Sequence, residues 1–247
     1  MHPPAAVSTS LDDLSVPRYE RVRLALQARI ADHVWDAAAP IPTEQVLSAE
    51  FDVSVGTIRK AVERLVKDGL LVKVQGKGTF IKRPDFKNSL LRFFRYRNQA
   101  GEPVVPTGVV KQVDIADPVS FINQRLGLGP ADRLIHLQRV RLVEHAAVLS
   151  ESIWLPYALF AKLADMPLER FGNLLYPFYD QVCGQFVSSA VETLSFVSDH
   201  TDEYLGSRRG ELLVKIERIA RNLQGGPIEY RVSYGRPQNF RYEVRIN

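Results

Sequence analysis

The sequence predicts a two-domain α+β protein, in which a small unit of helices and a β-hairpin precedes a larger domain of mixed strands and helices. Helical spacing of apolar residues before Asp68 and a glycine-rich turn at 75–78 indicate the first unit. Alternating apolar segments beyond residue 104 indicate the second. The length of 247 residues suits two ordinary domains, and 45% hydrophobic with 24% charged residues is typical of globular chains.

The first elements are helical by their pattern. Residues 1–17 are rich in Pro, Ala and Ser without periodicity, which predicts a mobile tail. An amphipathic helix follows, and Pro40 lies beyond its end. Its apolar stripe recurs at three- and four-residue steps, at Val22, Leu26, Ile30 and Val34.

Two further helices and a hairpin complete this unit. Thr43 is a good N-cap for a short helix to about Phe51, and Ser54 caps a third helix that runs to about Asp68. Residues 70–74 and 79–82 are predicted strands around the turn 75–78. This order predicts a winged helix-turn-helix over residues 18–83, followed by a polar linker at 84–89.

Charge is concentrated in the same unit. From Ser54 to Arg83 there are eight basic and two acidic residues, although the formal net charge of the whole chain is only +4. A local basic stripe indicates a nucleic-acid surface, and its alternative is an ordinary solvated face.

Residues 90–247 are predicted to form the second, α+β domain. Its predicted strands are 104–113, 134–143, 148–154, 186–197, 212–221 and 228–234. Its predicted helices are 118–126, 157–163, 173–182 and 199–207.

Strand 134–143 carries two arginines, Arg139 and Arg141, on one apolar face, and such charges need an anionic partner. Glu151 on the next strand is one candidate and a ligand phosphate or carboxylate is another. If Val143 pairs with Val148, Glu151 lies on the opposite face, and only a register shift or bulge would bring it to the arginines.

Several classes of function are disfavoured. No run of 18 apolar residues predicts a membrane span, the first residues do not form a secretory signal, and the single cysteine, Cys183, points to a reducing cytoplasm. The five histidines show no metal-ligand spacing, and phosphate-cradling and nucleophile motifs are absent from the sequence. We expect no metal, no cofactor and no enzymatic activity.

The motifs Pro42-Thr43-Glu44, Thr57-Ile58-Arg59-Lys60-Ala61, Asp68-Gly69-Leu70-Leu71 and Gln75-Gly76-Lys77-Gly78-Thr79-Phe80 together resemble the DNA-binding domain of the GntR family of bacterial transcription regulators. The resemblance spans about Tyr19 to Arg83. It implies DNA contacts at Thr43, Ser54, Thr57, Arg59, Gly76, Lys77 and Gly78. Hydroxyls at helix N-termini and a planar guanidinium suit phosphates and base edges.

Two positions depart from the family pattern, because Gln45 and Val55 stand where arginine is common. Either the operator differs from the usual one, or Lys60 and Arg64 take over part of the binding. Gly56 leaves the start of the third helix slim enough for close approach. The alternative for Arg59 is an ion pair with Glu63, and for Lys60 and Arg64 a solvated face.

The second domain resembles the UTRA effector domain of the HutC subfamily. The residues that carry this are Arg139-Val140-Arg141, Glu151, Leu155-Pro156, Leu175-Tyr176 and Pro227-Ile228-Glu229-Tyr230. The resemblance implies a chorismate-lyase-like α+β fold and a homodimer. It also implies an effector cavity lined by Phe94, Arg95, Thr107, Arg139, Arg141, Glu151, Tyr176, Glu229 and Tyr234. Because the two arginines and Glu151 share this implied cavity, we expect the register offset that brings Glu151 to them.

Together these features predict a regulator, of the repressor type usual in the family, that binds a double-stranded DNA operator and is controlled by a small anionic effector. Leu174 stands where regulators that bind sugar phosphates usually have serine, so a carboxylate is about as well supported as a phosphorylated metabolite. The alternatives are a lyase-like enzyme and a DNA-binding protein without an effector.

Overall fold

The computed structural model describes residues 15–32, 34–36, 39–82 and 104–239. The chain divides into two compact units, residues 1–84 and 85–247, and each is described by itself. The expected tail and the linker at 84–89 lie outside the described residues, apart from residues 15–17.

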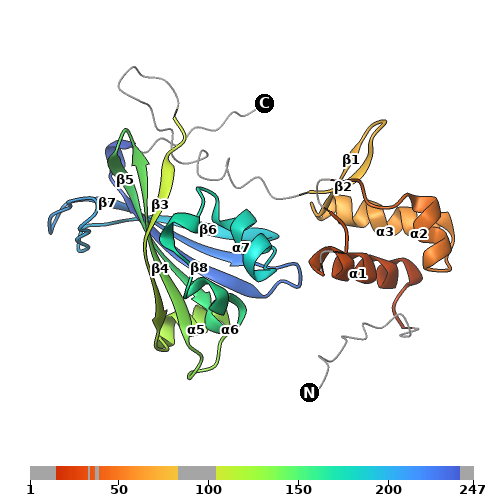
Figure 1. The fold of residues 1–247 in the computed structure, drawn as a ribbon, viewed down its shortest axis with the longest axis horizontal. Coiled ribbons are helices and arrows are strands. Elements are labelled where there is room, and N and C mark those ends of the chain that lie inside the picture. Colours follow the sequence, from red (N-terminus) through yellow and green to blue (C-terminus); the bar gives the residue numbers. More distant parts are fainter. Residues whose placement is uncertain (1–14, 33, 37–38, 83–103, 240–247) are drawn as a thin grey trace. The chain divides into compact units, whose positions relative to one another are not determined.

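The N-terminal unit contains three helices, α1 (Arg18–Ala31), α2 (Glu44–Glu50) and α3 (Val55–Lys67), and a hairpin of β1 (Leu71–Val74) and β2 (Gly78–Ile81). The hairpin projects from the helices as a wing (Figure 1). Each helix buries one apolar stripe, and the fully buried residues include Leu26, Leu47, Ile58, Leu65 and Leu71. The unit is therefore the predicted winged helix-turn-helix.

Local chemistry explains where these elements begin and end. The Thr43 side chain accepts a hydrogen bond from the Val46 N–H, and the Ser54 side chain accepts one from the Thr57 N–H, so both predicted N-caps are formed. Asp52, with φ of 48°, makes the tight turn between α2 and α3. Pro40 bridges to Phe80, and the Ile41 N–H donates to the Thr79 carbonyl at 2.8 Å, which extends the wing sheet.

The C-terminal unit is built on a six-stranded antiparallel sheet in the order β3-β4-β5-β8-β7-β6. The strands are β3 (Thr107–Ala116), β4 (Leu134–Val143), β5 (Ala146–Pro156), β6 (Ser189–Val197), β7 (Leu213–Arg221) and β8 (Pro227–Gly235). Strand direction changes strongly from β3 to β6, so the sheet is twisted (Figure 1).

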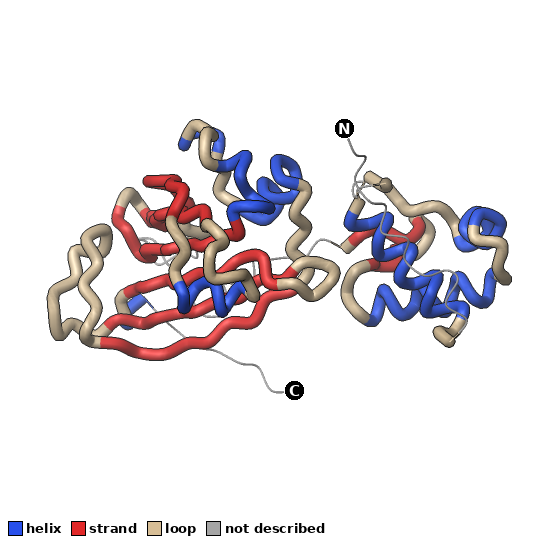
Figure 2. The backbone as a smooth tube through the Cα atoms, turned by 90° about the horizontal axis from the view of Figure 1, so that it is seen from below, coloured by secondary structure: helices blue, strands red, loops and turns tan. Residues whose placement is uncertain are grey.

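Helices cover parts of both faces of this sheet (Figure 2). On one face, α6 (Tyr157–Phe160) and α7 (Leu175–Cys183) pack in the largest apolar cluster, with the short 3-10 helix η1 (Ala161–Leu163). On the other face, α5 (Ser120–Leu126) packs over Leu134 and Tyr230. The remaining 3-10 turns are η2 (Leu168–Arg170) and η3 (Pro237–Asn239). The α+β prediction is confirmed.

Two local predictions for this unit were wrong. Residues 199–207 are not a helix: the Asp202 carboxylate accepts from the Leu205 N–H at 2.9 Å, and the Ser207 hydroxyl accepts from the Asp202 N–H at 2.7 Å. These side chains satisfy backbone groups that a helix would use, and they hold a turn instead. The first predicted strand, 104–113, lies three residues further along, at 107–116.

The connection between β4 and β5 is tighter than expected. Val143 pairs with Ala146, not Val148, across a two-residue turn. Glu144 and His145 both have positive φ, 47° and 69°, as a type I′ hairpin turn requires. The register then shifts at Val148, because Leu142 pairs with Ala147 but Arg141 pairs with Leu149. This bulge places Glu151 directly opposite Arg139, which is the offset expected from the UTRA resemblance.

Candidate DNA-binding surface and anion site

The exposed side of α3 carries the predicted DNA-contacting residues. Ile58, Ala61, Val62 and Leu65 are buried, which fixes the helix so that Gly56, Arg59 and Lys60 lie in the exposed part of its surface. Outside its chain neighbours and its own helix backbone, a Cβ built on Gly56 would meet only the Ser54 hydroxyl, at 3.8 Å, among the described residues, so the start of the helix is open. A helix presented in this way fits a DNA major groove about 12 Å wide.

Arg59 makes a different ion pair from the one considered in the sequence. Its Nε donates to Glu44 Oε2 at 2.9 Å, from α3 to the first turn of α2, and not to Glu63. The Arg59 side chain is still 58% exposed. The guanidinium is therefore held at one edge and open to solvent at the rest.

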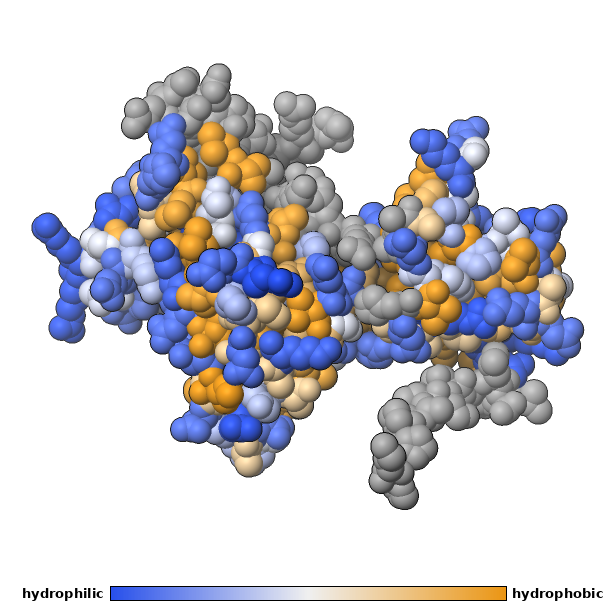
Figure 3. All heavy atoms as spheres, in the orientation of Figure 1, coloured by the Kyte–Doolittle hydropathy of each residue, from blue (hydrophilic) through white to orange (hydrophobic). Residues whose placement is uncertain are grey.

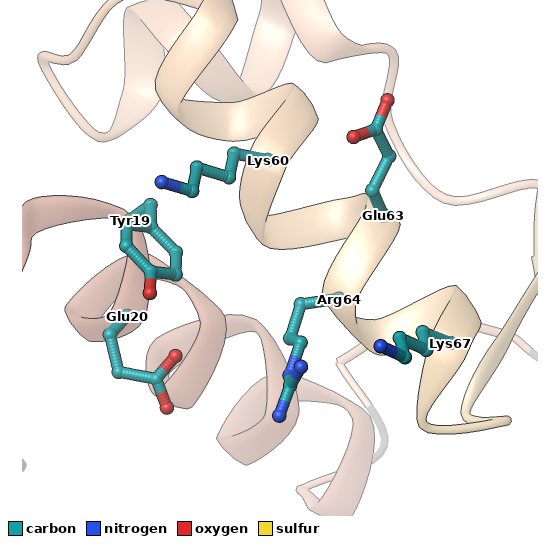
Figure 4. Close-up of a pocket in the computed structure, with 6 residues that line it drawn as sticks. All are labelled: Tyr19, Glu20, Lys60, Glu63, Arg64 and Lys67. Carbon is teal, nitrogen blue, oxygen red and sulfur yellow. The ribbon is translucent and has the colours of Figure 1, made fainter.

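Lys60 and Arg64 lie on the flank of α3 that faces the start of α1 (Figure 4). The Lys60 ammonium lies 4.0 Å from the centre of the Tyr19 ring, and Arg64 Nε lies 3.7 Å from Asp68. They line a depression of about 500 Å³, together with Tyr19, Glu20, Glu63 and Lys67. Three cations lie here beside two carboxylates, so the flank has a net positive charge that the carboxylates reduce.

The wing turn needs its glycines. Gly76 has φ of 73° with open space around it, and Gly78 has φ of 119°. A side chain on Gly78 would also lie 3.0 Å from the Pro40 ring. Gly76, Lys77 and Gly78 are all exposed, and the visible surface at the wing tip is hydrophilic (Figure 3). The tip can thus bring its backbone close to another polar surface.

The C-terminal unit buries a cluster of charges on the sheet face under α7. Arg139 Nη1 donates to Glu151 Oε2 at 3.1 Å, Arg141 Nε lies 3.3 Å from the same oxygen, and Arg231 Nη1 donates to Glu151 Oε1 at 3.2 Å. Arg139 is 1% exposed and Glu151 is fully buried. Three guanidinium groups therefore converge on one buried carboxylate.

A second carboxylate continues this cluster. Glu229 accepts hydrogen bonds from the Tyr176 hydroxyl at 2.9 Å, the Tyr179 hydroxyl at 3.0 Å and Arg231 Nη2 at 2.8 Å. Arg218 Nη1 donates to the Tyr176 hydroxyl at 3.0 Å, and its Nε donates to Glu192 at 2.7 Å. Tyr176 and Glu229 were predicted for the effector cavity, and the structure joins them to Arg139, Arg141 and Glu151 through Arg231.

Three residues of this cluster were missed by the sequence reasoning, namely Tyr179, Arg218 and Arg231. Arg218 and Arg231 pair across β7 and β8, and Arg218 shares its strand face with Ile216 and Ala220, the same signal that drew attention to Arg139. Tyr179 lies one helical turn after Tyr176 on α7. The alternation was visible, but the pairing of β5 with β8 was not.

Other predicted cavity residues lie elsewhere. Tyr234 pairs with Ser150, beside the pair of Ser233 and Glu151, so it points to the opposite face of the sheet from the cluster. It stacks on His200 with ring centres 3.7 Å apart. Thr107 is exposed at the start of β3, and Phe94 and Arg95 lie outside the described residues. Next to Thr107, Gly108 is the residue that contacts the cluster, because the Arg139 guanidinium packs against its Cα.

The charges of the cluster shift one another's pKa values. Burial alone would raise the pKa of Glu151, but Arg141, Arg231 and Arg139 hold it well below the ordinary value. Burial lowers the pKa of Arg139 to about 10, with Glu151 opposing the shift, so the group stays charged at neutral pH. Burial raises the pKa of Tyr176 to about 12. At neutral pH Arg139 and Glu151 are therefore ionised and Tyr176 is a neutral hydrogen-bond donor.

The arginines have unused donors. The Nε atoms of Arg139, Arg141 and Arg231 are buried and make no hydrogen bond with any described residue, although Arg141 Nε lies within ion-pair distance of Glu151. Buried donors without acceptors are costly, and guanidinium groups bind carboxylates and phosphates well. The chemistry of the cluster suits a small anion. No group of three His, Cys, Asp or Glu residues with the geometry of a metal site occurs among the described residues.

Comparison with known proteins identifies the families to which both units belong. Residues 102–241 match the UTRA domain, and residues 18–81 match the family described as bacterial regulatory proteins, gntR family. The chain is a gntR-family regulatory protein with a UTRA domain. The resemblance stated from the sequence is thereby confirmed for both halves. Within the described ranges, this gntR-family chain has no helix that is long and apolar enough to cross a membrane.

Curated relatives of this gntR-family chain include two named repressors. It is 29% identical over 167 residues to the mannosyl-D-glycerate transport/metabolism system repressor MngR of Escherichia coli K12. The aligned residues make up 67% of this chain and 68% of that protein. It is 23% identical over 230 residues to the transcriptional repressor NagR of Bacillus subtilis 168, and the aligned residues make up 92% of this chain and 93% of that protein.

Solved structures show the same fold. The Bacillus subtilis protein YydK superposes with a TM-score of 0.52 at 21% identity, over 94% of this chain and all of that one. The ligand-binding domain of a regulator assigned to the GntR family from Bordetella bronchiseptica superposes with a TM-score of 0.54 at 21% identity, over 63% of this chain and 98% of that one.

Proposed function

We propose that this regulator is a transcription repressor that binds a duplex DNA operator as a homodimer and releases it when a small anion binds in the UTRA domain. The DNA-binding part of this proposal rests on α3. This helix buries one apolar face and exposes Arg59, Lys60 and Gly56 beside a hydrophilic wing. The named roles of the relatives, MngR and NagR, support repression over activation and over a lyase-like enzyme.

The DNA-binding surface comprises the two helix N-termini, the flank of α3 and the wing tip. Its residues are Thr43, Ser54, Gly56, Thr57, Arg59, Lys60, Arg64, Gly76, Lys77 and Gly78. Thr43 and Ser54 place hydroxyls and backbone N–H groups at the starts of α2 and α3, which suits phosphates. In a dimer, two copies of α3 would read half-sites about 34 Å apart, one turn of DNA. The binding takes place in the cytoplasm, where bacterial operators lie.

The effector half of the proposal rests on the buried arginine cluster. Among the described residues, the buried Nε donors of Arg139 and Arg231 have no acceptor, and Arg141 Nε has only the ion pair with Glu151, which favours an anion, a carboxylate or a phosphorylated metabolite, over a neutral or cationic ligand. Tyr176 and Tyr179 already donate to Glu229, so they can position a ligand through that carboxylate. An effector controls DNA binding only if it prefers one of two arrangements of the dimer.

A two-stage binding experiment tests both halves. An operator is first selected from random duplexes with the full-length protein, and its affinity is measured by fluorescence anisotropy over a salt series. We expect log K to fall linearly with log salt, because phosphate contacts release counterions. An affinity that ignores salt would contradict the DNA-binding half.

The second stage screens small carboxylates and sugar phosphates by thermal shift. Compounds that raise the melting temperature are then added to the protein–operator complex. We expect at least one of them to weaken operator binding, and the Arg141→Gln variant to lose that response. If the ligands that bind leave operator affinity unchanged, the effector half fails while the DNA-binding half stands.

A further inference from the structure

Glu44 joins three elements of the DNA-binding unit. Its Oε2 accepts from Arg59 Nε on α3 at 2.9 Å, and its Oε1 lies 3.2 Å from the Lys73 ammonium on β1. Glu44 itself is the first residue of α2, directly after the Thr43 cap. One carboxylate therefore ties α2, α3 and the wing together, with one oxygen for each cation.

The bond from Glu44 fixes Arg59 at its Nε and leaves its terminal donors available. An arginine has five N–H donors in a rigid plane, and only one of them is on Nε. The Arg59 side chain is 58% exposed, whereas the Glu44 side chain is 25% exposed, so the carboxylate lies deeper than the guanidinium it holds. The four Nη donors of Arg59 are thus held outward on a flexible side chain that would otherwise sample many rotamers.

The carboxylate stays ionised for this role. Burial alone would raise the pKa of Glu44, but the hydrogen bonds from Arg59 and Lys73 lower it below the ordinary value. Arg59 is also the one arginine between Ser54 and Glu63, because position 55 is valine. Arg59 is therefore the one side chain in residues 54–63 with a guanidinium that can bind a base edge through two hydrogen bonds.

We propose that Glu44 is a specificity-determining positioning residue, which orients Arg59 toward a guanine edge and penalises DNA that does not offer one. This inference rests on the proposed DNA binding. A preorganised Arg59 loses less entropy when it meets the correct base. The negative charge of Glu44 also repels phosphates wherever Arg59 finds no base to bind, so it weakens binding to other sequences. Glu44 raises the ratio of specific to non-specific affinity rather than the affinity itself.

The test compares two carboxylates of the same unit in the full-length protein. Glu44→Gln removes the charge that holds Arg59, and Glu63→Gln removes a charge from the exposed surface of α3 that has no contact with Arg59. Each variant binds the selected operator, the same duplex with its guanines replaced one at a time, and an unrelated duplex. Both variants lose one negative charge, so both should bind unrelated DNA more tightly.

Only Glu44→Gln is expected to lose discrimination. We expect the ratio of operator to unrelated affinity to fall roughly tenfold, with most of the loss at one guanine position. The double variant Glu44→Gln/Arg59→Ala should have the same ratio of operator to unrelated affinity as the single variant Arg59→Ala. Equal ratios for Glu44→Gln and Glu63→Gln would overturn the inference, as would additive losses with Arg59→Ala.

Two further variants separate orientation from other roles. Glu44→Asp keeps the charge but shortens the side chain, so it should also lose discrimination while unrelated DNA is bound as by the wild type. It takes the place of Glu44→Gln if that variant has a lowered melting temperature. Lys73→Gln leaves the Arg59 bond in place and should keep discrimination at the guanine; a tenfold loss there would assign the effect to the wing instead. If the wild type itself shows no salt-dependent operator binding, the proposed function fails, not this inference alone.

Discussion

The arginines of the two units work in opposite environments. Arg59 in the DNA-binding unit is 58% exposed and shares its carboxylate with a lysine. Arg139 in the UTRA unit is 1% exposed, and its partner Glu151 is fully buried. The same side chain thus meets water on α3 and a low-dielectric interior on β4, and its electrostatic energy depends on that difference far more than on the distances, which are 2.9 and 3.1 Å.

The difference separates what each arginine can do. An exposed pair contributes about 0–1 kcal/mol, so the free donors of Arg59 can bind and leave DNA with little effect on folding. A buried pair is costly to break, because the charge that remains has no water to solvate it. The cluster around Glu151 therefore suits a site that must stay assembled until an anion enters, and the surface of α3 suits contacts that form and break with DNA.

The largest expected effect is that of removing the buried carboxylate. Glu151→Gln leaves Arg139, Arg141 and Arg231 facing one another without their shared anion, so we expect a loss of about 3–5 kcal/mol in the free energy of unfolding of the UTRA unit. Urea denaturation measures it. The matched control is Glu44→Gln, which removes a partly exposed carboxylate that also has two cationic partners and should cost about 1 kcal/mol or less. Equal losses would mean that burial does not distinguish the two clusters.

Acid should reproduce that effect in the wild type. The pKa of Glu151 is lowered by folding, so its contribution to stability is present above the ordinary value of 4.5 and is lost as pH falls below it toward the folded-state pKa. We expect the free energy of unfolding of the UTRA unit to fall between about pH 5 and about pH 3, and to fall less in Glu151→Gln. Parallel curves for the two proteins would exclude Glu151 as the titrating group.

A smaller effect is expected from Gly108. A Cβ at this position would lie 1.9 Å from Arg139 Nη2, so Gly108→Ala must displace the guanidinium from Glu151. We expect a loss of about 1–3 kcal/mol in stability, and loss of the thermal shift caused by the effector. Gly172→Ala is the control, since no atom lies within 4 Å of a Cβ there. A normal effector response in Gly108→Ala would remove Arg139 from the ligand site.

The smallest effect on folding is expected from Arg59. Arg59→Ala should weaken operator binding by about 1–3 kcal/mol, while the melting temperature and the oligomeric state stay unchanged. Fluorescence anisotropy gives the affinity and light scattering the mass. Arg209→Ala, an exposed arginine of the UTRA unit, should leave operator affinity unchanged. An unaltered affinity in Arg59→Ala would exclude Arg59 from the interface.

Local signals predicted the N-terminal unit closely. The hydroxyls of Thr43 and Ser54 and the glycines of the wing act within a few residues of themselves, so the helix starts and the turn could be predicted from the sequence. The helix expected at 199–207 failed because Asp202 and Ser207 bond to nearby backbone instead. These elements show that capping chemistry outweighs apolar spacing in short segments.

The C-terminal cluster depends on pairing between distant strands. The strand pattern placed Arg139 and Arg141 on one face of β4, but only the resemblance to the UTRA domain indicated that Glu151 would meet them, because the expected register put it on the other face. Arg231 and Glu229 reach the same site only because β8 pairs with β5, some 80 residues apart along the chain. The alternation of β8 gives two faces but does not say which one meets Glu151, and Tyr234 was assigned to the wrong one of the two.

The extra residue at Val148 has a consequence for how this protein can change over generations. If every residue stayed but no bulge formed, the pairing of Val143 with Ala146 would continue along the ladder, and Glu151 would stand beside Gln138 on the opposite side of the sheet. Loss of the Val148 codon would instead remove the bulge and leave Glu151 opposite Arg139, because the pairs beyond Val148 already follow that register. At this point β5 can therefore shorten by one residue while its inner and outer faces stay the same.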